Sequence, residues 1–152
     1  MKEKISIIGA GNWGTTQAVF LARKGLEVEL HSVFDAHNRK MAKDRENKLY
    51  LKGTKFPAKL KVNPSLKETL KNQIIVIAIP VKFIRKVVRK IGSQAPSLKN
   101  KVFLSLSKGI EVTSLKRPSQ IMEEELEITN VAVLSAISLL PYRIVIEIHL
   151  RF

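Results

Sequence analysis

Hydrophobic positions along the chain alternate between short apolar runs and amphipathic stretches. The apolar runs are rich in β-branched residues, which is typical of strands, and the stretches between them have helical periodicity. The predicted strands are residues 5–8, 27–31, 60–62, 74–79, 101–106 and 131–134. The predicted helices are residues 15–24, 36–48, 66–71, 83–91 and 118–126. Strands that alternate with helices in this way predict an α/β fold of the Rossmann type, with a doubly wound and mainly parallel sheet.

Two of these segments carry the clearest patterns. The run at 74–79 is apolar throughout, as expected for a parallel strand that is buried on both faces. The helix after Pro80 has one apolar face and one face rich in lysine and arginine. We interpret that basic face as a solvated helix surface.

The overall charge bears on the partners that the protein could bind and not on its fold. The 152 residues correspond to about one domain, and 27 Lys and Arg against 13 Asp and Glu give a formal net charge of +14. Such a surface attracts phosphate groups, nucleic acid or anionic membranes. We interpret it as a solvated basic surface, and steering of anionic substrates or cofactors is the main alternative. Charge alone, without a recognition motif, leads us to expect no nucleic-acid partner.

Several classes of chemistry are excluded by what the sequence lacks. There is no cysteine, which removes disulfides, thiolate catalysis and cysteine-based zinc sites. The three histidines show no metal-ligand spacing, so no metal is expected. No stretch approaches about 18 uncharged apolar residues, and the first residues do not form a signal peptide. We therefore expect a cytoplasmic protein with no membrane span.

The candidate chemistry begins at a glycine-rich turn between the first strand and the first helix. Gly9-Ala10-Gly11-Asn12-Trp13-Gly14 has the G-x-G-x-x-G form of a dinucleotide-binding turn. Gly9 makes the tight turn, Gly11 lets the backbone approach a pyrophosphate, and Gly14 allows the helix to pack on the strand. Free N–H groups at the helix N-terminus favour phosphate. We predict that Gly9, Gly11, Asn12, Trp13 and Gly14 bind a dinucleotide.

An acidic residue is expected about 20 residues further on, where it binds the ribose hydroxyls. Asp35 lies at that place, after the second strand, and Glu29 within that strand is the weaker alternative. Residues 33–34 include no arginine that would bind a 2′-phosphate, which favours NAD. Arg39 and Lys40 keep NADP open.

Five segments, in order along residues 5–135, carry a resemblance to a known family. They are GAGNWGTT at 9–16, RENKLYLKG at 45–53, AIP at 78–80, SKGIE at 107–111 and VLS at 133–135. Each resembles a motif of the NAD(P)-dependent glycerol-3-phosphate dehydrogenases, although Lys52 replaces the usual proline. Trp13 within the glycine motif is the most specific element. The resemblance implies hydride transfer between dihydroxyacetone phosphate and sn-glycerol 3-phosphate, with NAD as cofactor and NADP as the alternative.

The resemblance also implies roles for three further residues. Residues 32–35 and 80–83 resemble the eukaryotic branch, in which two phenylalanines border the adenine, here Phe34 and Phe83. From its pattern alone, Phe83 is equally well explained as core. Lys108 follows a strand at the sheet edge where ligands bind, and the family's corresponding lysine contacts substrate and cofactor. The alternative is a solvated lysine in a lysine-rich chain.

The resemblance stops abruptly after Ser135. A glycine-proline-serine motif is replaced here, and only Ser138 keeps a hydroxyl suited to substrate binding. The family's helical substrate domain, with its main catalytic lysine, finds no match in residues 136–152. We interpret 1–135 as the NAD(P)-binding domain and 136–152 as a divergent tail, the product of a truncation or frameshift. Weak or absent turnover is expected. The alternating pattern at 144–149 predicts a strand that extends the sheet or becomes an exposed edge.

Three alternatives remain beside this interpretation. Another Rossmann dehydrogenase, of the ketopantoate or 6-phosphogluconate type, is disfavoured by Trp13 and the RENKLYLKG and SKGIE segments. A non-catalytic nucleotide-binding remnant is favoured by the missing catalytic residues. A nucleic-acid-binding domain is favoured by charge alone. A homodimer is left open.

Overall fold

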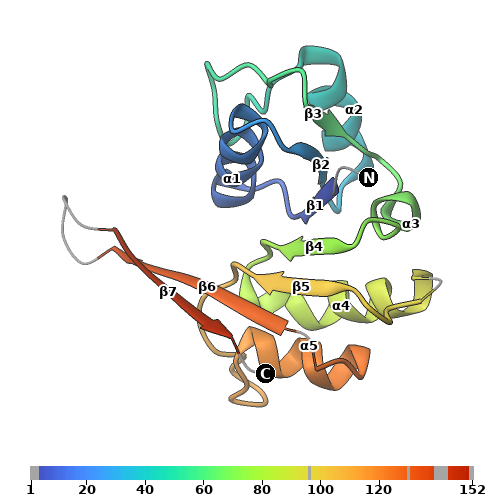
Figure 1. Cartoon of the computed structure of the whole chain (residues 1–152), viewed down its shortest axis with the longest axis vertical. Helices are drawn as coiled ribbons and strands as arrows, with labels where there is room; N and C mark the ends of the chain where they lie inside the picture. Colours follow the sequence, from blue (N-terminus) through green and yellow to red (C-terminus); the bar gives the residue numbers. More distant parts are fainter. Residues whose placement is uncertain (1–3, 96, 130, 139–143, 151–152) are drawn as a thin grey trace.

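The computed structural model describes residues 4–95, 97–129, 131–138 and 144–150 (Figure 1). Its strands are β1 (Lys4–Ile8), β2 (Glu27–His31), β3 (Leu60–Val62), β4 (Ile74–Ile77), β5 (Val102–Ser105), β6 (Val131–Ser138) and β7 (Ile144–Leu150). Its helices are α1 (Asn12–Arg23), α2 (Asp35–Asp44), α3 (Leu66–Thr69), α4 (Val81–Gln94) and α5 (Pro118–Leu126). The expected alternation of strands and helices is therefore confirmed.

One sheet contains all these strands, in the order β3-β2-β1-β4-β5-β6-β7. The first six strands run parallel, and β7 pairs antiparallel with β6. β1 lies between β2 and β4, so the direction of winding reverses there: Ile7 pairs with Leu30 on one side and with Val76 on the other. In such sheets ligands bind outside the carboxyl ends of the strands, at this switch point. The fold class predicted from the sequence is confirmed.

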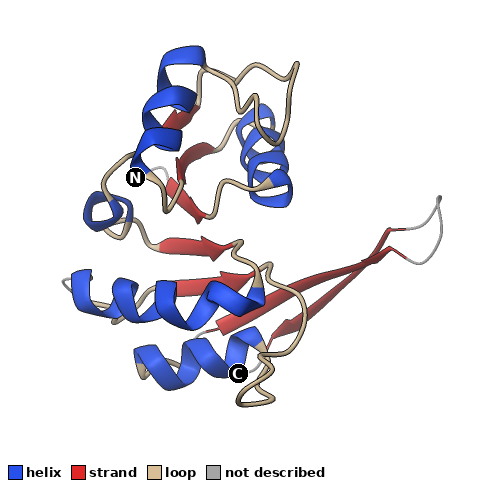
Figure 2. Cartoon of the chain, turned by 180° about the vertical axis from the view of Figure 1, so that it is seen from behind, coloured by secondary structure: helices blue, strands red, loops and turns tan. Residues whose placement is uncertain are grey.

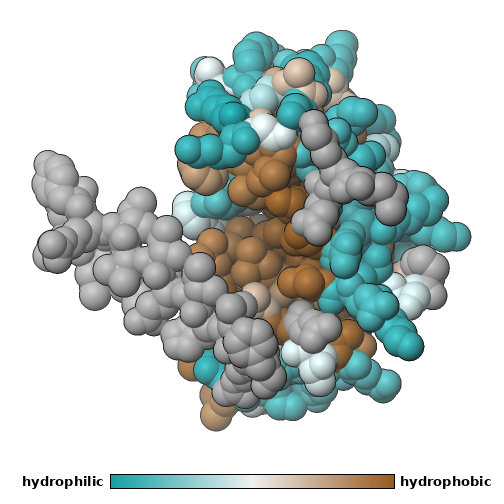
Figure 3. Space-filling view, in the orientation of Figure 1, coloured by the Kyte–Doolittle hydropathy of each residue, from teal (hydrophilic) through white to brown (hydrophobic). Residues whose placement is uncertain are grey.

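The core has two parts, one on each face of the sheet. Figure 2 shows α4 and α5 on the near side of the half of the sheet that contains β5 and β6. On this face lies a cluster of buried side chains that includes Ile77, Ile84 and Phe103. The other face carries α1, whose Ala18 packs in a second cluster with Leu30. Figure 3 shows apolar side chains gathered along the middle of the molecule in the view of Figure 1. The two clusters fix the sheet as the rigid base from which the connecting loops project.

The ends of the helices differ from the prediction for identifiable reasons. α1 begins at Asn12, three residues early, because Gly11 serves as its N-cap. α2 ends at Asp44 instead of residue 48, because Arg45 has a left-handed backbone with φ of 51°. That conformation sends the Arg45 guanidinium toward β3, where it donates to the carbonyl of Leu60 at 2.8 Å. Sequence periodicity does not record such a long-range contact.

The last two strands form a hairpin that extends away from the helices (Figure 1). β6 continues to Ser138, four residues beyond its predicted end, and seven residue pairs join it to β7. The strand predicted at 144–149 is therefore present. It extends the sheet and also forms its edge, since β7 is last in the strand order.

Candidate functional site

Two glycines of the turn after β1 are required by close packing. Gly9 has φ of +116°, and a Cβ added there would lie 2.2 Å from the carbonyl oxygen of Ala78. A Cβ on Gly14 would lie 1.9 Å from the carbonyl oxygen of Gly9. Both distances are far below van der Waals contact. The turn thus brings β1, α1 and the end of β4 closer together than any side chain would allow.

Gly11 differs from Gly9 and Gly14, because a Cβ added at Gly11 would have no atom within 4 Å. Its φ of −75° is open to any residue, so neither packing nor backbone geometry requires glycine here. It is the N-cap of α1, whose first turn carries no acidic side chain. Unpaired N–H groups and the helix dipole favour an anion at such an end. The open space at Gly11 fits a group that approaches the backbone closely, as a pyrophosphate does.

Asn12 and Trp13 occupy the first turn of α1. Trp13 is partly buried against the cluster of apolar side chains under α1. The side-chain oxygen of Asn12 accepts a long hydrogen bond of 3.5 Å from the hydroxyl of Thr16, one turn further. Trp13 therefore has a packing role in the structure, in addition to any contact with a ligand.

The carboxyl ends of β2 and β4 carry the two candidate phenylalanines. Phe34 is the N-cap of α2 and its side chain is 67% exposed. Phe83 lies in the first turn of α4 and is 51% exposed, so it is not part of the core. The ammonium of Lys82 lies 4.8 Å from the Phe83 ring centroid. Large exposed apolar groups on both sides of β1 are available to a planar ligand.

The two acidic candidates for ribose binding, Asp35 and Glu29, lie in different surroundings. Asp35 begins α2 and is exposed at the carboxyl end of β2. An acidic side chain there also stabilises the N-terminus of its own helix. Glu29 lies within β2, and its carboxylate accepts a hydrogen bond of 3.0 Å from the side chain of Asn63. Of these two acidic side chains, Asp35 is the one that lies at the carboxyl edge of the sheet.

Lys108 lies in the loop after β5 and its side chain is exposed. The next residue, Gly109, has φ of +96°, and a Cβ there would lie 3.3 Å from Cγ1 of Val81. The hydroxyl of Ser107 accepts a hydrogen bond of 3.2 Å from the backbone N–H of Ile79. These contacts hold the Lys108 loop against the segment between β4 and α4, on the same sheet edge as the glycine turn.

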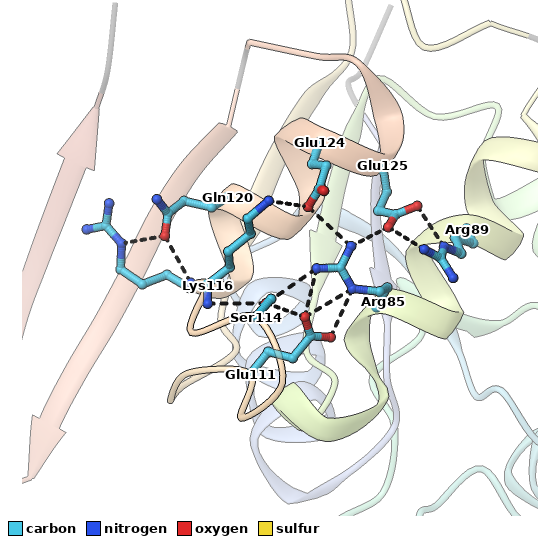
Figure 4. Close-up of polar contacts among 9 residues, drawn as sticks. Arg85, Arg89, Glu111, Ser114, Lys116, Gln120, Glu124 and Glu125 are labelled. Atoms are coloured by element: carbon cyan, nitrogen blue, oxygen red, sulfur yellow. Dashed lines mark hydrogen bonds and ion pairs between the residues drawn. The ribbon is translucent and has the colours of Figure 1, made fainter.

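A network of ion pairs braces the same loop (Figure 4). Arg85 of α4 points between Glu111, which ends the SKGIE segment, and two glutamates of α5. Its Nη2 lies 2.7 Å from Oε2 of Glu111. Glu125 also accepts from Arg89, with 2.8 Å between Nε and Oε2, and Lys116 pairs with Glu124 at 2.9 Å. The loop is thus tied to both helices that cover this half of the sheet.

The network shifts the titration of its members. Hydrogen bonds from Arg85, and then from Ser114, lower the pKa of Glu111 from 4.5 to about 2. Hydrogen bonds to Glu111 and Glu125 raise the pKa of Arg85. Both side chains are therefore charged at any ordinary pH, so the network acts as a structural brace and has no use as an acid–base pair.

The segment that resembles RENxxYLxG has a structural role that sequence reasoning did not assign. The Arg45 guanidinium donates to the carbonyl of Pro57 at 2.8 Å as well as to that of Leu60. The carboxylate of Glu46 accepts from the backbone N–H of Gly53 at 2.9 Å and pairs with Lys55 at 2.8 Å. Among the sequence signals, only the family resemblance pointed to these residues. Their partners are backbone groups or residues distant along the chain, which periodicity does not reveal.

The remaining expectations concern Ser138, metals and membranes. Ser138 ends β6, and its side chain lies outside what the structure describes. Among the described residues, no group of three or more His, Asp or Glu is placed to hold a metal ion. None of the helices in the described ranges is both long and apolar enough to cross a membrane.

The sheet order and the glycine turn at its switch point define a dinucleotide-binding domain of the Rossmann class. The family model described as "NAD-dependent glycerol-3-phosphate dehydrogenase N-terminus" matches residues 4–139. The chain belongs to this family, as its sequence motifs predicted.

Curated relatives agree with this assignment. A glycerol-3-phosphate dehydrogenase [NAD(P)+] of Chlorobium phaeobacteroides is 38% identical over 136 residues, which are 89% of this chain and 40% of the relative. The corresponding protein of Citrifermentans bemidjiense is 37% identical over 139 residues, 91% of this chain and 41% of the relative. The chain thus spans about 40% of the length of these relatives.

Solved structures give the same result. The glycerol-3-phosphate dehydrogenase of Coxiella burnetii matches with a TM-score of 0.82 and 32% identity, over 91% of this chain and 42% of that one. The yeast enzyme matches with a TM-score of 0.73 and 27% identity, over 90% and 42%. The resemblance of residues 32–35 and 80–83 to the eukaryotic branch is therefore local, since the bacterial structure is more similar over the whole chain. A prephenate dehydrogenase from A. aeolicus, at 12% identity and a TM-score of 0.63, shares only the fold.

Proposed function

We propose that the chain is the cofactor-binding part of an NAD(P)-dependent glycerol-3-phosphate dehydrogenase. The observation that carries this proposal is the open space at Gly11, at the N-terminus of α1 and at the switch point of the sheet. Neither packing nor backbone geometry explains a glycine at that position. A bound pyrophosphate explains it, because a side chain there would block the approach of the phosphates to the helix N–H groups.

The other site residues take roles along the length of the cofactor. The turn from Gly9 to Gly14 would hold the pyrophosphate, Asp35 the adenosine ribose, and Phe34 and Phe83 the adenine. Asp35 supports NAD, because a carboxylate repels the 2′-phosphate of NADP. When bound, the nicotinamide supplies the hydride chemistry, and this chain's residues orient it at the sheet edge.

Lys108 is the candidate for the substrate side. Its loop lies on the edge of the glycine turn, and an ammonium there can bind an anionic substrate and stabilise charge that develops on an oxygen. The relatives' names give glycerol 3-phosphate as their substrate, and the family resemblance implies dihydroxyacetone phosphate as its oxidised partner. Ser138 is a second candidate contact. The expected reaction of the whole enzyme is hydride transfer between these two compounds.

A second candidate function is nucleotide binding without turnover. It concerns these 152 residues as an isolated sample, which match about 40% of the length of a curated relative. Substrate orientation is sensitive to small displacements, so a site assembled from part of an enzyme is expected to turn over weakly or not at all.

A fluorescence titration of the purified chain with NADH and NADPH, followed by a dihydroxyacetone phosphate reduction assay, tests both candidates. Saturable NADH binding supports the cofactor site, and turnover in the same sample supports the complete activity. Binding without turnover favours the second candidate. Absence of binding to either nucleotide would contradict both.

A further inference from the structure

The RENKLYLKG segment contains a fully buried polar residue next to the glycine turn. Asn47 is 0% exposed, although it lies on a connection between α2 and β3. Its amide nitrogen donates to the carbonyl oxygen of Ala10 at 2.9 Å and to the hydroxyl of Thr15 at 2.8 Å. Ala10 lies between Gly9 and Gly11, and Thr15 follows Gly14 directly. Asn47 therefore holds the glycine turn at both of its ends.

The other atom of the same amide reaches the adenosine side. Oδ1 of Asn47 lies 3.1 Å from Nε2 of His37 in α2. The Nδ1 atom of that ring lies 3.1 Å from the hydroxyl of Ser32, directly after β2. The Ser32 hydroxyl in turn accepts from the backbone N–H of Phe34 at 3.2 Å. One chain of hydrogen bonds thus connects the glycine turn to the segment that carries Phe34 and Asp35.

The direction of these hydrogen bonds follows from their end points. The carbonyl of Ala10 only accepts, so the Asn47 nitrogen must face it, and the Asn47 oxygen must face His37. That oxygen only accepts, so Nε2 of His37 carries a proton. A neutral His37 then accepts the Ser32 hydroxyl proton at Nδ1, while the Ser32 oxygen accepts from Phe34. Oδ1 of Asn47 also accepts from the backbone N–H of Tyr50 at 3.3 Å, so it keeps one partner if the His37 link is lost. Loss of the Asn47 amide nitrogen, by contrast, removes a buried donor from both the Ala10 carbonyl and the Thr15 hydroxyl.

We infer that Asn47 and His37 are positioning residues for the dinucleotide: they fix the phosphate-binding turn and the adenosine-binding segment relative to each other. The inference rests on the proposed cofactor site and adds two residues to it that need not touch the cofactor. Pre-organising both ends of the site lowers the cost of ordering them when the ligand binds.

Asn47→Asp is the sharpest test, because it keeps the size of the side chain but replaces the donor with an oxygen. We expect NADH affinity to fall roughly tenfold, as for loss of a buried hydrogen bond. His37→Phe keeps an aromatic ring beside Tyr50 (ring centroids 5.7 Å apart) and removes both hydrogen bonds. It is expected to weaken NADH binding severalfold. The double variant should bind about as weakly as Asn47→Asp alone, because both changes break one chain.

Thr69→Val is the matched control. Its hydroxyl donates a hydrogen bond of 2.7 Å to the carbonyl of Ser65, in α3 at the end of the sheet where β4 begins (Figure 1). It should lower the melting temperature and leave NADH affinity unchanged in samples that circular dichroism shows to be folded. Unchanged affinity in both Asn47→Asp and His37→Phe, or fold-changes that multiply in the double variant, would overturn the inference while the proposed cofactor site stands. If the unsubstituted chain binds neither NADH nor NADPH, the proposed function is wrong and the inference falls with it.

Discussion

Arg85 and Glu111 join α4 to the loop that carries Lys108, with 2.7 Å between Nη2 and Oε2. The two residues are 26 positions apart and come from the two connections that follow β4 and β5. Nε of Arg85 also lies 3.0 Å from each oxygen of the same carboxylate. An ion pair with this many hydrogen bonds, between side chains that are 20% and 13% exposed, holds its loop more firmly than an exposed pair does.

The first prediction concerns acid. The pKa of Glu111 is lowered from 4.5 to about 2, so the unfolded chain binds its proton more tightly than the folded chain. The stabilisation is complete above about pH 4.5 and is lost as the pH falls from there toward 2. Glu111→Gln should lower the melting temperature at pH 7 and should lose less further stability between pH 5 and 3 than the unsubstituted chain, as followed by circular dichroism. Glu123→Gln is the control, because Glu123 makes no ion pair with any described residue; if both variants match the unsubstituted chain at every pH, the brace contributes nothing.

The second prediction separates the glycines of the turn. Gly14→Ala would place a Cβ 1.9 Å from the carbonyl oxygen of Gly9, so it should destabilise the chain by about 3 kcal/mol or more. Gly11→Ala meets no atom within 4 Å and needs no unusual φ, so its free energy of unfolding should change by less than about 1 kcal/mol. NADH affinity should nevertheless fall at least tenfold, because the methyl group occupies the space of the pyrophosphate. Urea denaturation and NADH fluorescence measure the two effects. A stable Gly11→Ala variant with full affinity would contradict the proposed position of the phosphates.

The parts of the site that could be predicted from the sequence are those encoded locally. The alternation of strands and helices and the spacing of Gly9, Gly11 and Gly14 are short-range patterns, and each strand buried on both faces leaves an apolar run. The ends of α2 and β6 were missed because tertiary contacts decide them. Arg45 leaves the helix to donate to Leu60, and β6 is extended by pairing with β7.

The supporting contacts of the site could not be predicted in the same way. Asn47 reaches Ala10 across 37 positions and Arg85 reaches Glu111 across 26, and no periodicity connects such pairs. Phe83 could not be decided from the sequence, because its helical spacing fits core packing and a ligand contact equally well. The structure places it in the first turn of α4 with 51% exposure, which removes the core explanation.

The third prediction uses three exposed phenylalanines. Phe34, Phe83 and Phe20 are 67%, 51% and 52% exposed, so truncating any of them to alanine should change stability little. If the first two border the adenine, Phe34→Ala and Phe83→Ala should each weaken NADH binding by about 3- to 10-fold, the loss expected for one aromatic contact. Phe20→Ala, on α1 beside Lys24, should bind NADH normally. Equal affinity for all three variants would place the adenine elsewhere.

The fourth prediction concerns His31, which ends β2 directly beside the glycine turn. Its side chain is 4% exposed, and its backbone carbonyl accepts from the N–H of Gly9 at 2.9 Å. Burial is the largest cause that lowers the pKa of His31 below its ordinary value of 6.5; the hydrogen bond to Asn63 opposes it. Nδ1 lies 2.9 Å from the carbonyl oxygen of Asn63 and must donate to it, so Nε2 is the nitrogen that remains unprotonated.

A lowered histidine pKa makes folding weaker in acid, because the unfolded chain takes up a proton that the folded chain resists. Stability should be full above about pH 6.5 and should fall as the pH drops below it, well before Glu111 begins to titrate. His31→Asn keeps a donor for the Asn63 carbonyl without a titrating ring. The urea midpoint of this variant should be lower at pH 7.5, because a smaller side chain leaves a gap, but should decline less between pH 7.5 and 5.5 than that of the unsubstituted chain. If the two midpoints decline in parallel over that range, protonation of His31 does not control stability there.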